Sequence, residues 1–547
     1  MVNHHPPSER HLFFDNQSIE MIQDLSRVMH NPVKTGPAII YKDKPWEVLP
    51  YFGNSLWTIL HDPVEGLFRC WYEDWVLDPD GLSNSDVDIT DPSVSSSRVL
   101  YAEARDGLKW DKPALGIVRE GGHNTNIVLG DSRDDPEVFG SPHVPTVLDD
   151  PLDSDPSRRF KMIFQHISKG SADTDSVADP LGVGAPQVLH SPIRMAYSHD
   201  GIHWTVEPTP LKFGGLGPKL GDEGVLSADL TKREYVLHTR HPYAWLIDMP
   251  EGTPRTKAWS SPYWPENSAR YNKRRIFRTT SSDLIHWNEP YEVFAADDES
   301  DNLDDSFYSF ASWPLSTPAT GVKRHPHPGN NLHVGIVNVF HQTENVLDGQ
   351  LAYSRDGLTW QRAGQRQPFL NRGAVGEWDE MMSCVPSIPI RIGDEFYIYY
   401  GGSNAHHDWW VVGAREGLDV PEAKDINLVE HGIGLARLRV DGFVSLRTGL
   451  VREGLLVTRS VVARGTQLVI NANCHAGGYV DVEMTDQQDN VIEGFSRTTV
   501  GRFTGDDVAH RVKWGQSDRW PHNLSLIHIS EPTRPRLISY AVFCLKK

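Results

Sequence analysis

Residues 195–204 read MAYSHDGIHW, which is a short apolar strand, an Asp-Gly turn and a second segment ending on tryptophan. An Asp-Gly pair supplies the positive-φ position of a tight hairpin at little cost. The tryptophan adds a large apolar surface that a neighbouring sheet can cover. The stretch therefore predicts a β-hairpin that packs against another sheet.

Related stretches occur at four other places in the chain. They are VLYAEARDGLKW at 99–110, IFRTTSSDLIHW at 276–287, LAYSRDGLTW at 351–360, and a degenerate copy, GLARLRVDGF at 434–443, in which phenylalanine replaces tryptophan. Self-similarity of this kind is the sequence signature of a repeat architecture. Five copies predict five similar sheets.

Each copy is preceded by further β-type sequence. Middle strands are expected at 68–72, 160–164, 235–239, 333–340 and 396–400, and inner strands at positions such as 145–148 and 224–227. Inner, middle and outer strands in this order are typical of a propeller blade. We therefore expect an all-β fold with a five-bladed β-propeller over residues 1–450, closed by N-terminal residues around Leu12-Phe13-Phe14 because joining the first and last blades removes an open edge.

The repeat stops near residue 455, and the later strands alternate as in a β-sandwich, which we place at 451–524. Residues 525–547 resemble translated sequencing-adapter read-through, so we treat them as a probable non-native tail. On that interpretation the sandwich lacks its natural final strand, and an unpaired sheet edge is expected.

Composition narrows the classes of partner. With 53 Lys plus Arg against 73 Asp plus Glu, the net charge is −20, which disfavours nucleic acid and anionic membrane surfaces. No long apolar run and no leader-like N-terminus is present in the sequence, so a cytoplasmic location is expected. The four scattered cysteines predict neither disulfides nor a zinc site. We expect no cofactor, although a structural Ca²⁺ in the funnel is compatible with the sequence, and the oligomeric state is left open.

The SxDGxxW and SSDLxxW segments, five predicted blades and an appended sandwich resemble the five-bladed propeller glycosidases, notably glycoside hydrolase families 32 and 43. This resemblance implies cleavage of furanosides by carboxylates on the inner strands. The family motifs Asn-Asp-Pro-Asn-Gly, Arg-Asp-Pro and Glu-Cys are not found, so no catalytic residue is carried over from them. Sialidases are less similar, because their Asp boxes have a residue between Asp and Gly and their blades number six.

Glycoside hydrolysis needs one protonated and one ionised carboxyl group, and clustered carboxylates raise the pKa of at least one of them. In a propeller these groups come from the starts of inner strands. The catalytic candidates at those positions are Asp222, Asp305 and Asp379, followed by Glu380 and Glu223. Solvated turn residues are the ordinary explanation for any single one of them.

Five further residues are expected to bind substrate. Glu73 and His143 belong to the first two blades, Arg240 ends the middle strand of the third, and Trp378 and His407 could form an aromatic and polar rim in the fifth. For His143, a hydrogen-bonded strand-end histidine is the more ordinary role. No metal ligands are assigned, because adjacent histidines in an extended loop point apart.

The predicted function is a glycoside hydrolase acting on a furanoside or short oligosaccharide, with a carbohydrate substrate as its partner. A non-catalytic carbohydrate-binding propeller is the alternative, favoured by the missing family motifs. A sialidase-like or lyase activity would need a cluster of arginines in the cavity, where the sequence places only Arg240.

Overall fold

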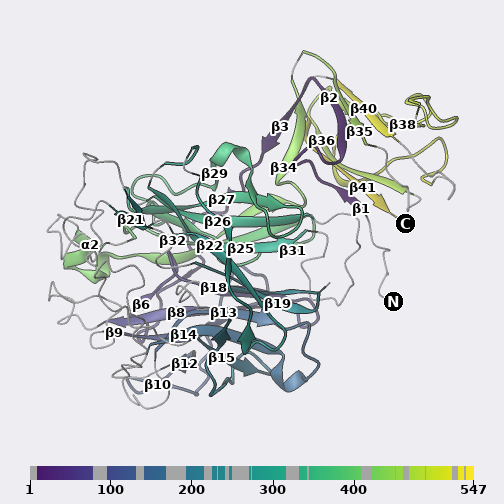
Figure 1. The fold of residues 1–547 in the computed structure, drawn as a ribbon. Coiled ribbons are helices and arrows are strands. Elements are labelled where there is room, and N and C mark those ends of the chain that lie inside the picture. The colour runs from purple at the N-terminus through teal and green to yellow at the C-terminus, as the bar shows by residue number, and fades with distance from the viewer. Residues whose placement is uncertain are drawn as a thin grey trace.

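The computed structural model describes most of the chain and is dominated by antiparallel β-sheets (Figure 1). The described residues are 9–77, 95–130, 141–167, 193–214, 224–230, 232–240, 246–248, 270–272, 274–297, 299–302, 304–315, 332–341, 344–407, 409, 421–449, 451–459, 467–486, 488–519, 528–534 and 538–546. Within these ranges, no helix is long and apolar enough to cross a membrane. The fold is all-β, as the sequence predicts.

Five antiparallel groups of strands contain the five sequence repeats. The first consists of β7 (Thr58–Asp62), β8 (Leu67–Leu77), β9 (Ser95–Ala104), β12 (Ile127–Gly130) and the short β6 (Leu49–Pro50). The second consists of β13 (Ser141–Asp149), β14 (Phe160–Ile167), β15 (Ile193–Ser198) and β16 (Thr205–Val206). The third consists of β18 (Gly224–Asp229), β19 (Glu234–Arg240), β22 (Ile276–Ser281), β23 (His286–Trp287), β24 (Tyr291–Phe294) and β17 (Lys212–Phe213).

The last two groups join in one larger sheet through a contact between Leu347 and Met382. The fourth consists of β25 (Asp305–Pro314), β26 (His333–His341), β27 (Val346–Ser354), β28 (Gln361–Arg362) and β29 (Pro368–Leu370). The fifth consists of β30 (Met382–Cys384), β31 (Ile390–Ile392), β32 (Glu395–Ser403), β33 (His431–Arg439), β4 (Val33–Lys34) and β5 (Ile40–Tyr41). The strands predicted from the repeat therefore all form.

Smaller elements lie within the groups, between consecutive strands of one group. They are the hairpins β10 (Arg119–Glu120) with β11 (His123–Asn124) and β20 (Leu246–Asp248) with β21 (Arg270–Asn272), the one-turn helix α2 (Pro421–Lys424), and the 3₁₀ turns η1 (Pro156–Arg158), η3 (Gly364–Arg366) and η5 (Ile426–Leu428).

Four of the five repeated Asp-Gly or Asp-Leu segments form turns of one geometry, which we call the repeat turns. In each, one carboxylate oxygen of the aspartate accepts hydrogen bonds from the backbone N–H groups two and three residues later, at 2.7–2.9 Å; the aspartates are Asp106, Asp200, Asp283 and Asp356. These bonds lower the pKa of all four carboxyl groups. The short polar side chain thus fixes the turn locally.

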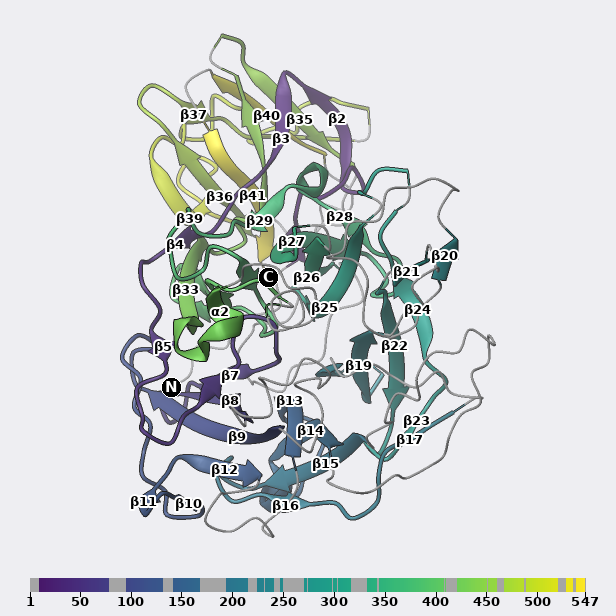
Figure 2. The same ribbon diagram turned by 90° about the vertical axis from the view of Figure 1, so that its left-hand side faces the viewer.

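Successive groups pack on one another, and the fifth packs back on the first. One core cluster joins each neighbouring pair: Trp71 with Phe160, Met195 with Leu237, Phe294 with Phe310, Leu351 with Ile398, and Tyr399 with Phe68. Figure 2 shows the groups following one another around the molecule in chain order. Because the last interface returns to the first group, the row of sheets closes on itself.

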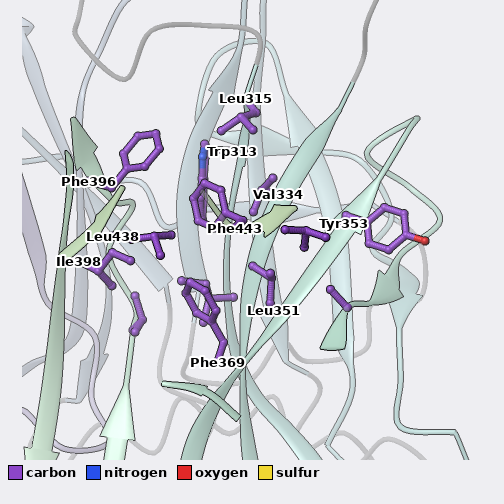
Figure 3. Packing of buried hydrophobic residues seen from close by; sticks show 14 of the residues in the cluster. Trp313, Leu315, Val334, Leu351, Tyr353, Phe369, Phe396, Ile398, Leu438 and Phe443 are labelled. Atoms are coloured by element: carbon purple, nitrogen blue, oxygen red, sulfur yellow. The ribbon is translucent and has the colours of Figure 1, made fainter. Parts of the chain in front are cut away.

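The interface between the fourth and fifth groups contains the largest aromatic cluster (Figure 3). Trp313, Val334 and Leu351 come from the fourth group, and Ile398 and Leu438 come from the fifth. Phe443 is fully buried and stacks on Phe369 at a ring-centroid distance of 5.9 Å. The phenylalanine of the degenerate repeat therefore fills a core position between two sheets.

The strands that complete the fifth group differ from the sequence expectation. β4 and β5 pair with β33, so residues 33–41 add the N-terminal strands to the last repeat. The expected closing residues lie elsewhere, because Phe13 packs in a C-terminal cluster while Leu12 and Phe14 pack against the fourth and fifth groups. Alternation along an extended chain sends neighbouring side chains to opposite sides, which lets this segment bridge two cores.

Beyond residue 443 the strands form a separate unit together with the N-terminus (Figure 1). One sheet has the order β1 (Glu9–His11), β41 (Ile538–Lys546), β36 (Gln467–Cys474) and β39 (Asp506–Arg511). Another combines β2 (Ile19–Gln23), β35 (Gly454–Thr458), β40 (His528–Arg534), β37 (Tyr479–Val480) and β38 (Glu483–Thr485). A third pair is β3 (Leu25–Met29) with β34 (Val444–Thr448).

The strands of residues 525–547 hold interior positions in this unit. β41 lies between β1 and β36, and β40 pairs with β35, β37 and β38. The expected unpaired edge is therefore not found at this place, because these strands pair on both sides. That the segment is non-native stays a prediction.

Candidate functional site

The polar residues of interest lie where the inner strands begin. In an antiparallel pair the start of one strand lies beside the end of the next, so Ser141 of β13 faces Ile167 and Asp305 of β25 faces His341. Leu56, Val144 and Val225, at the starts of the first three inner strands, pack together. We use the name inner edge for the end of the five groups at which their inner strands begin. In the first three groups these three residues mark it.

Glu73 is the most deeply buried acid at the inner edge, with no exposed surface. Its carboxylate accepts a hydrogen bond from the Ser55 hydroxyl at 2.6 Å and one from the Val144 backbone N–H at 3.1 Å. His143 Nδ1 lies 2.7 Å from the other carboxylate oxygen. The structure thus brings together two predicted substrate-binding residues, and the carboxylate fixes the orientation of the imidazole.

Val144 has a backbone conformation that explains how these groups converge. Its φ is +49°, in the left-handed region that a β-branched residue rarely adopts. The register of β13 against β14 shifts between His143 and Thr146, so the residue sits in a β-bulge. Backbone strain of this kind is concentrated at ligand-binding and catalytic positions.

His431 and Asn54 complete this part of the inner edge. The Gly53 N–H donates to His431 Nδ1 at 3.1 Å, and burial lowers the pKa of His431 to about 3, so the ring is neutral with its proton on Nε2. Asn54 donates from Nδ2 to the Tyr51 hydroxyl at 2.9 Å, and the Tyr51 ring lies 5.3 Å from the His431 ring.

Two polar atoms of this group have no hydrogen-bond partner among the described residues: His431 Nε2, a donor, and Asn54 Oδ1, an acceptor. Both residues are more than nine-tenths buried, with exposures of 7% and 3%. Buried polar groups are almost always paired with protein, water or a ligand. A hydroxyl group can accept a hydrogen bond from a donor such as Nε2 and can donate one to an acceptor such as Oδ1.

Asp305, a predicted catalytic residue, is held by a histidine between two carboxylates. His341 Nδ1 lies 2.6 Å from Asp305, and its Nε2 lies 2.9 Å from Asp348. Burial opposes the charge on His341, but the hydrogen bonds to both carboxylates outweigh it and raise the pKa to about 10. Burial alone would raise the pKa of Asp305, but the hydrogen bond and charge of His341, together with hydrogen bonds from Asn302, give a net lowering of this pKa. Asp305 is therefore an ionised carboxylate beside an imidazolium.

Two arginines meet on one aromatic ring near Asp305. The guanidinium of Arg240 lies 4.0 Å from the centroid of the Tyr308 ring, and that of Arg274 lies 4.9 Å from it. His407 packs on Tyr308 at 4.9 Å and on Phe340 at 4.4 Å. Arg240 and His407, predicted separately from the sequence, therefore both pack against Tyr308, and Arg274 adds a second cation.

Asp379 has a different environment. Lys34 Nζ lies 2.5 Å from Asp379 Oδ2, and the Tyr400 hydroxyl donates to the same oxygen at 3.1 Å. Trp378 stacks on Tyr400 at a ring-centroid distance of 5.6 Å, and Glu380 accepts a hydrogen bond from the Gly376 N–H. Asp379 and Trp378 thus take part in attaching β4 to the fifth group, with partners different from those of Asp305.

Asp222 and Glu223, the remaining catalytic candidates, lie outside the described residues. Several residues of the inner edge were not predicted from the sequence, namely Tyr51, Asn54, Arg274, His341, Asp348 and His431. One usable signal was the position of His341 and His431, which directly end a middle strand and begin an outer one. The described residues contain no group of acids, histidines or cysteines that could hold a metal ion.

No family model and no curated protein matches this chain. Among solved structures, it is similar to an N-acetylgalactosamine deacetylase from F. plautii in complex with blood group B trisaccharide (TM-score 0.42, 13% identity, 76% of this chain and 96% of that chain). It is also similar to a β-1,2-mannobiose phosphorylase from Listeria innocua (0.40, 11%, 77% and 98%) and to a family 117 glycoside hydrolase from Zobellia galactanivorans (0.37, 10%, 76% and 90%). Similarity at this level supports no functional assignment.

Proposed function

We propose that this chain is a carbohydrate-active enzyme that hydrolyses a furanoside or short oligosaccharide, built on a five-bladed β-propeller followed by a β-sandwich. Five repeat-containing groups that pack in a closed order support the propeller. Paired sheets around a common apolar cluster support the sandwich.

The observation that carries the proposal is the pair of unsatisfied buried atoms, His431 Nε2 and Asn54 Oδ1, beside the Glu73–His143 pair. A sugar presents several hydroxyl groups, each of which can accept from one partner and donate to another. A strained backbone at Val144 positions these groups at the inner edge. We assign Glu73, His143, Asn54 and His431 to substrate binding.

In this proposal Asp305 acts as the ionised carboxylate, either as nucleophile or as base toward water. His341 keeps it ionised, because an imidazolium beside a carboxylate favours the charged form. The protonated carboxyl group is assigned to Asp222 or Glu223, which directly precede β18 in the sequence. No catalytic role is assigned to Asp379, whose carboxylate is paired with Lys34.

A screen over chromogenic fructo-, arabino- and galactofuranosides tests the proposal. We expect turnover of at least one substrate, and a loss of about 10³-fold in kcat for Asp305→Asn, since removing a group that bears charge in the transition state costs about this much. The matched control is Asp304→Asn, the same change one residue earlier, which should retain activity. Full activity of Asp305→Asn would overturn the assignment.

A non-catalytic carbohydrate-binding propeller is the second candidate. It is favoured by the ion pair of Asp379 with Lys34, which removes one predicted catalytic carboxylate from the chemistry. Calorimetric titration with the same sugars separates the two proposals. Binding without turnover selects this one, and turnover excludes it.

A further inference from the structure

A cavity of about 570 Å³ lies away from the inner edge, between the outermost strands of the third and fourth groups. Its walls come from β24 and from the turn that leads into β28. The strands β24 and β28 each pair only with the third strand of their group. The volume is within the usual range for small-molecule sites, which is roughly 300–1,000 Å³. Figure 2 shows β24 and β28 on neighbouring sheets.

One wall of the cavity is held in a strained conformation. Gly364, Gln365 and Arg366 have φ values of +63°, +54° and +63°, so three successive residues are left-handed. Such residues normally occur singly, because a side chain costs about 1–2 kcal/mol in this region. The turn places Arg366 in the lining, where its guanidinium lies 2.8 Å from Asp297 and 3.1 Å from Asp301.

Trp360, which also lines the cavity, differs from the corresponding tryptophans of two other repeats. Trp204 donates its indole N–H to the Gly201 carbonyl and Trp287 donates to the Leu284 carbonyl, both at 3.0 Å. Trp360 Nε1 has no partner among the described residues, although its residue is 92% buried, with a relative exposure of 8%. Trp110 Nε1, in the first repeat, likewise has no partner among the described residues. The cavity is therefore lined by Trp360 through its ring, and the ring face is the part of this residue that a ligand can contact.

The charges of the lining indicate what kind of ligand fits. Glu292 and Asp297 balance Arg362 and Arg366, and Val293, Phe294 and Leu358 add apolar surface beside the Trp360 indole. A charged ligand would meet as many repulsive as attractive side chains in this lining. A neutral polyhydroxyl ligand can instead donate to the carboxylates and accept from the guanidinium groups. An aromatic ring also suits the apolar face of a sugar.

We infer that this cavity is a second ligand site, which binds a neutral mono- or disaccharide through Trp360, Arg366 and their acidic neighbours. The site is separate from the inner edge, and the inference does not rest on the proposed hydrolysis. Its chemistry needs no metal and no covalent step.

The test uses the full chain labelled with 5-fluorotryptophan and observed by fluorine NMR. Of the 17 tryptophans, Trp360 is assigned as the resonance that disappears in Trp360→Phe. Titration with glucose, galactose, mannose, fructose, arabinose and their common disaccharides should shift this resonance saturably for at least one sugar. Saturation-transfer measurements of the same sugar then give the affinity of each variant.

Three variants decide the outcome. Trp360→Phe replaces the indole with a smaller aromatic ring and so removes part of the stacking surface, for which the dissociation constant should rise about fivefold. Ala295→Trp fills the cavity and should abolish the shift, while Trp204→Phe, the matched change in another repeat, should leave affinity unchanged. The inference is overturned if no neutral sugar shifts the Trp360 resonance, or if Trp204→Phe weakens binding as much as Trp360→Phe.

Discussion

The repeat turns and the inner edge belong to the same five groups of strands but differ in how much they vary. Four repeat turns place an aspartate, two backbone N–H donors and a hairpin in one arrangement. At the inner edge, the first two groups meet at Glu73 and His143, and the fourth carries Asp305 and His341. The residues that repeat build the sheets, and the residues that differ from one group to the next form the candidate site.

The repeat turns also differ from one another at one position, the residue that follows the aspartate. Glycine occupies the left-handed position in three of them, at Gly107, Gly201 and Gly357, whereas Leu284 has φ +67° in the third group. Leu284 is almost fully buried in the core between the second and third groups. Burial of its side chain therefore offsets a backbone cost of about 1–2 kcal/mol.

After that of Asp305→Asn, the largest expected effect on activity is also at the inner edge. Glu73→Gln replaces the carboxylate that orients His143 and accepts from Ser55 and Val144, so kcat/KM on the substrate found in the screen should fall about 100-fold, mainly through a rise in KM. Assays over a range of substrate concentrations separate the two constants. An unchanged KM with normal folding would mean that Glu73 is only structural.

An effect of similar size, on stability, is expected when the imidazolium between two acids is removed. His341→Asn leaves Asp305 and Asp348 without their imidazolium, which should destabilise the protein by about 3 kcal/mol near pH 6. Because the folded pKa of His341 is raised from 6.5 to about 10, its stabilising contribution is complete below pH 6.5 and is lost as the pH rises toward 10. Urea unfolding at pH 6, 8 and 10 measures the difference between wild type and variant, which should shrink steadily. A difference that grows with pH would contradict the ion-pair account.

The contribution of Asp305 to stability has the opposite pH dependence. Its pKa is lowered from 3.8, so its contribution is present above about pH 4 and is lost as the pH falls below that value. Wild-type stability from this cluster should therefore decline on both sides of neutral pH.

A smaller effect is expected where Asp379 attaches the N-terminal strand. Lys34→Met leaves the Asp379 carboxylate buried without its cation and should cost about 2 kcal/mol in the free energy of unfolding. The double variant with Asp379→Asn should recover much of this loss, because the unpaired charge is gone. If Asp379→Asn alone instead abolishes turnover at unchanged stability, Asp379 returns to the list of catalytic residues.

The smallest effect compares two repeat turns. Gly201→Ala adds the left-handed cost and brings Cβ within 2.6 Å of the Trp71 ring, so we expect a loss of about 2 kcal/mol. Gly357→Ala carries the same backbone cost, but its Cβ would lie 3.3 Å from the His333 ring, so about 1 kcal/mol is expected. Thermal or urea unfolding of both variants checks the order, and equal losses would show that the contact with Trp71 has no effect.

The strands could be predicted because their signal is local. Apolar runs bounded by Asp-Gly turns located the middle and outer strands of every group. The closing strands could not be located, because Leu12–Phe14 and Val33–Lys34 are both short, and only contacts with distant residues such as Ala436 decide their places. Tertiary pairing, which no local pattern encodes, makes that choice.

The candidate site was predictable only in part for a similar reason. Strand positions were enough to select His143 and Asp305, which lie near the starts of β13 and β25. Glu73 was selected because it follows the predicted middle strand 68–72, although it lies within the longer strand β8. Strand positions gave no reason to expect Lys34 beside Asp379, which lies hundreds of residues away in the sequence. Asn54 and His431 were missed because their role depends on which of their atoms lack partners, and this appears only when the groups are assembled.

The interleaving of β1 and β2 with β41 and β35 has a consequence for biosynthesis. A ribosome makes β1 and β2 first, but their pairing partners emerge only after all five repeats have been translated. These two segments therefore stay unpaired during nearly the whole of elongation, and they can aggregate or bind chaperones in that time. Slow translation should aggravate that hazard, and the C-terminal unit should be the last part of the nascent chain to resist proteolysis.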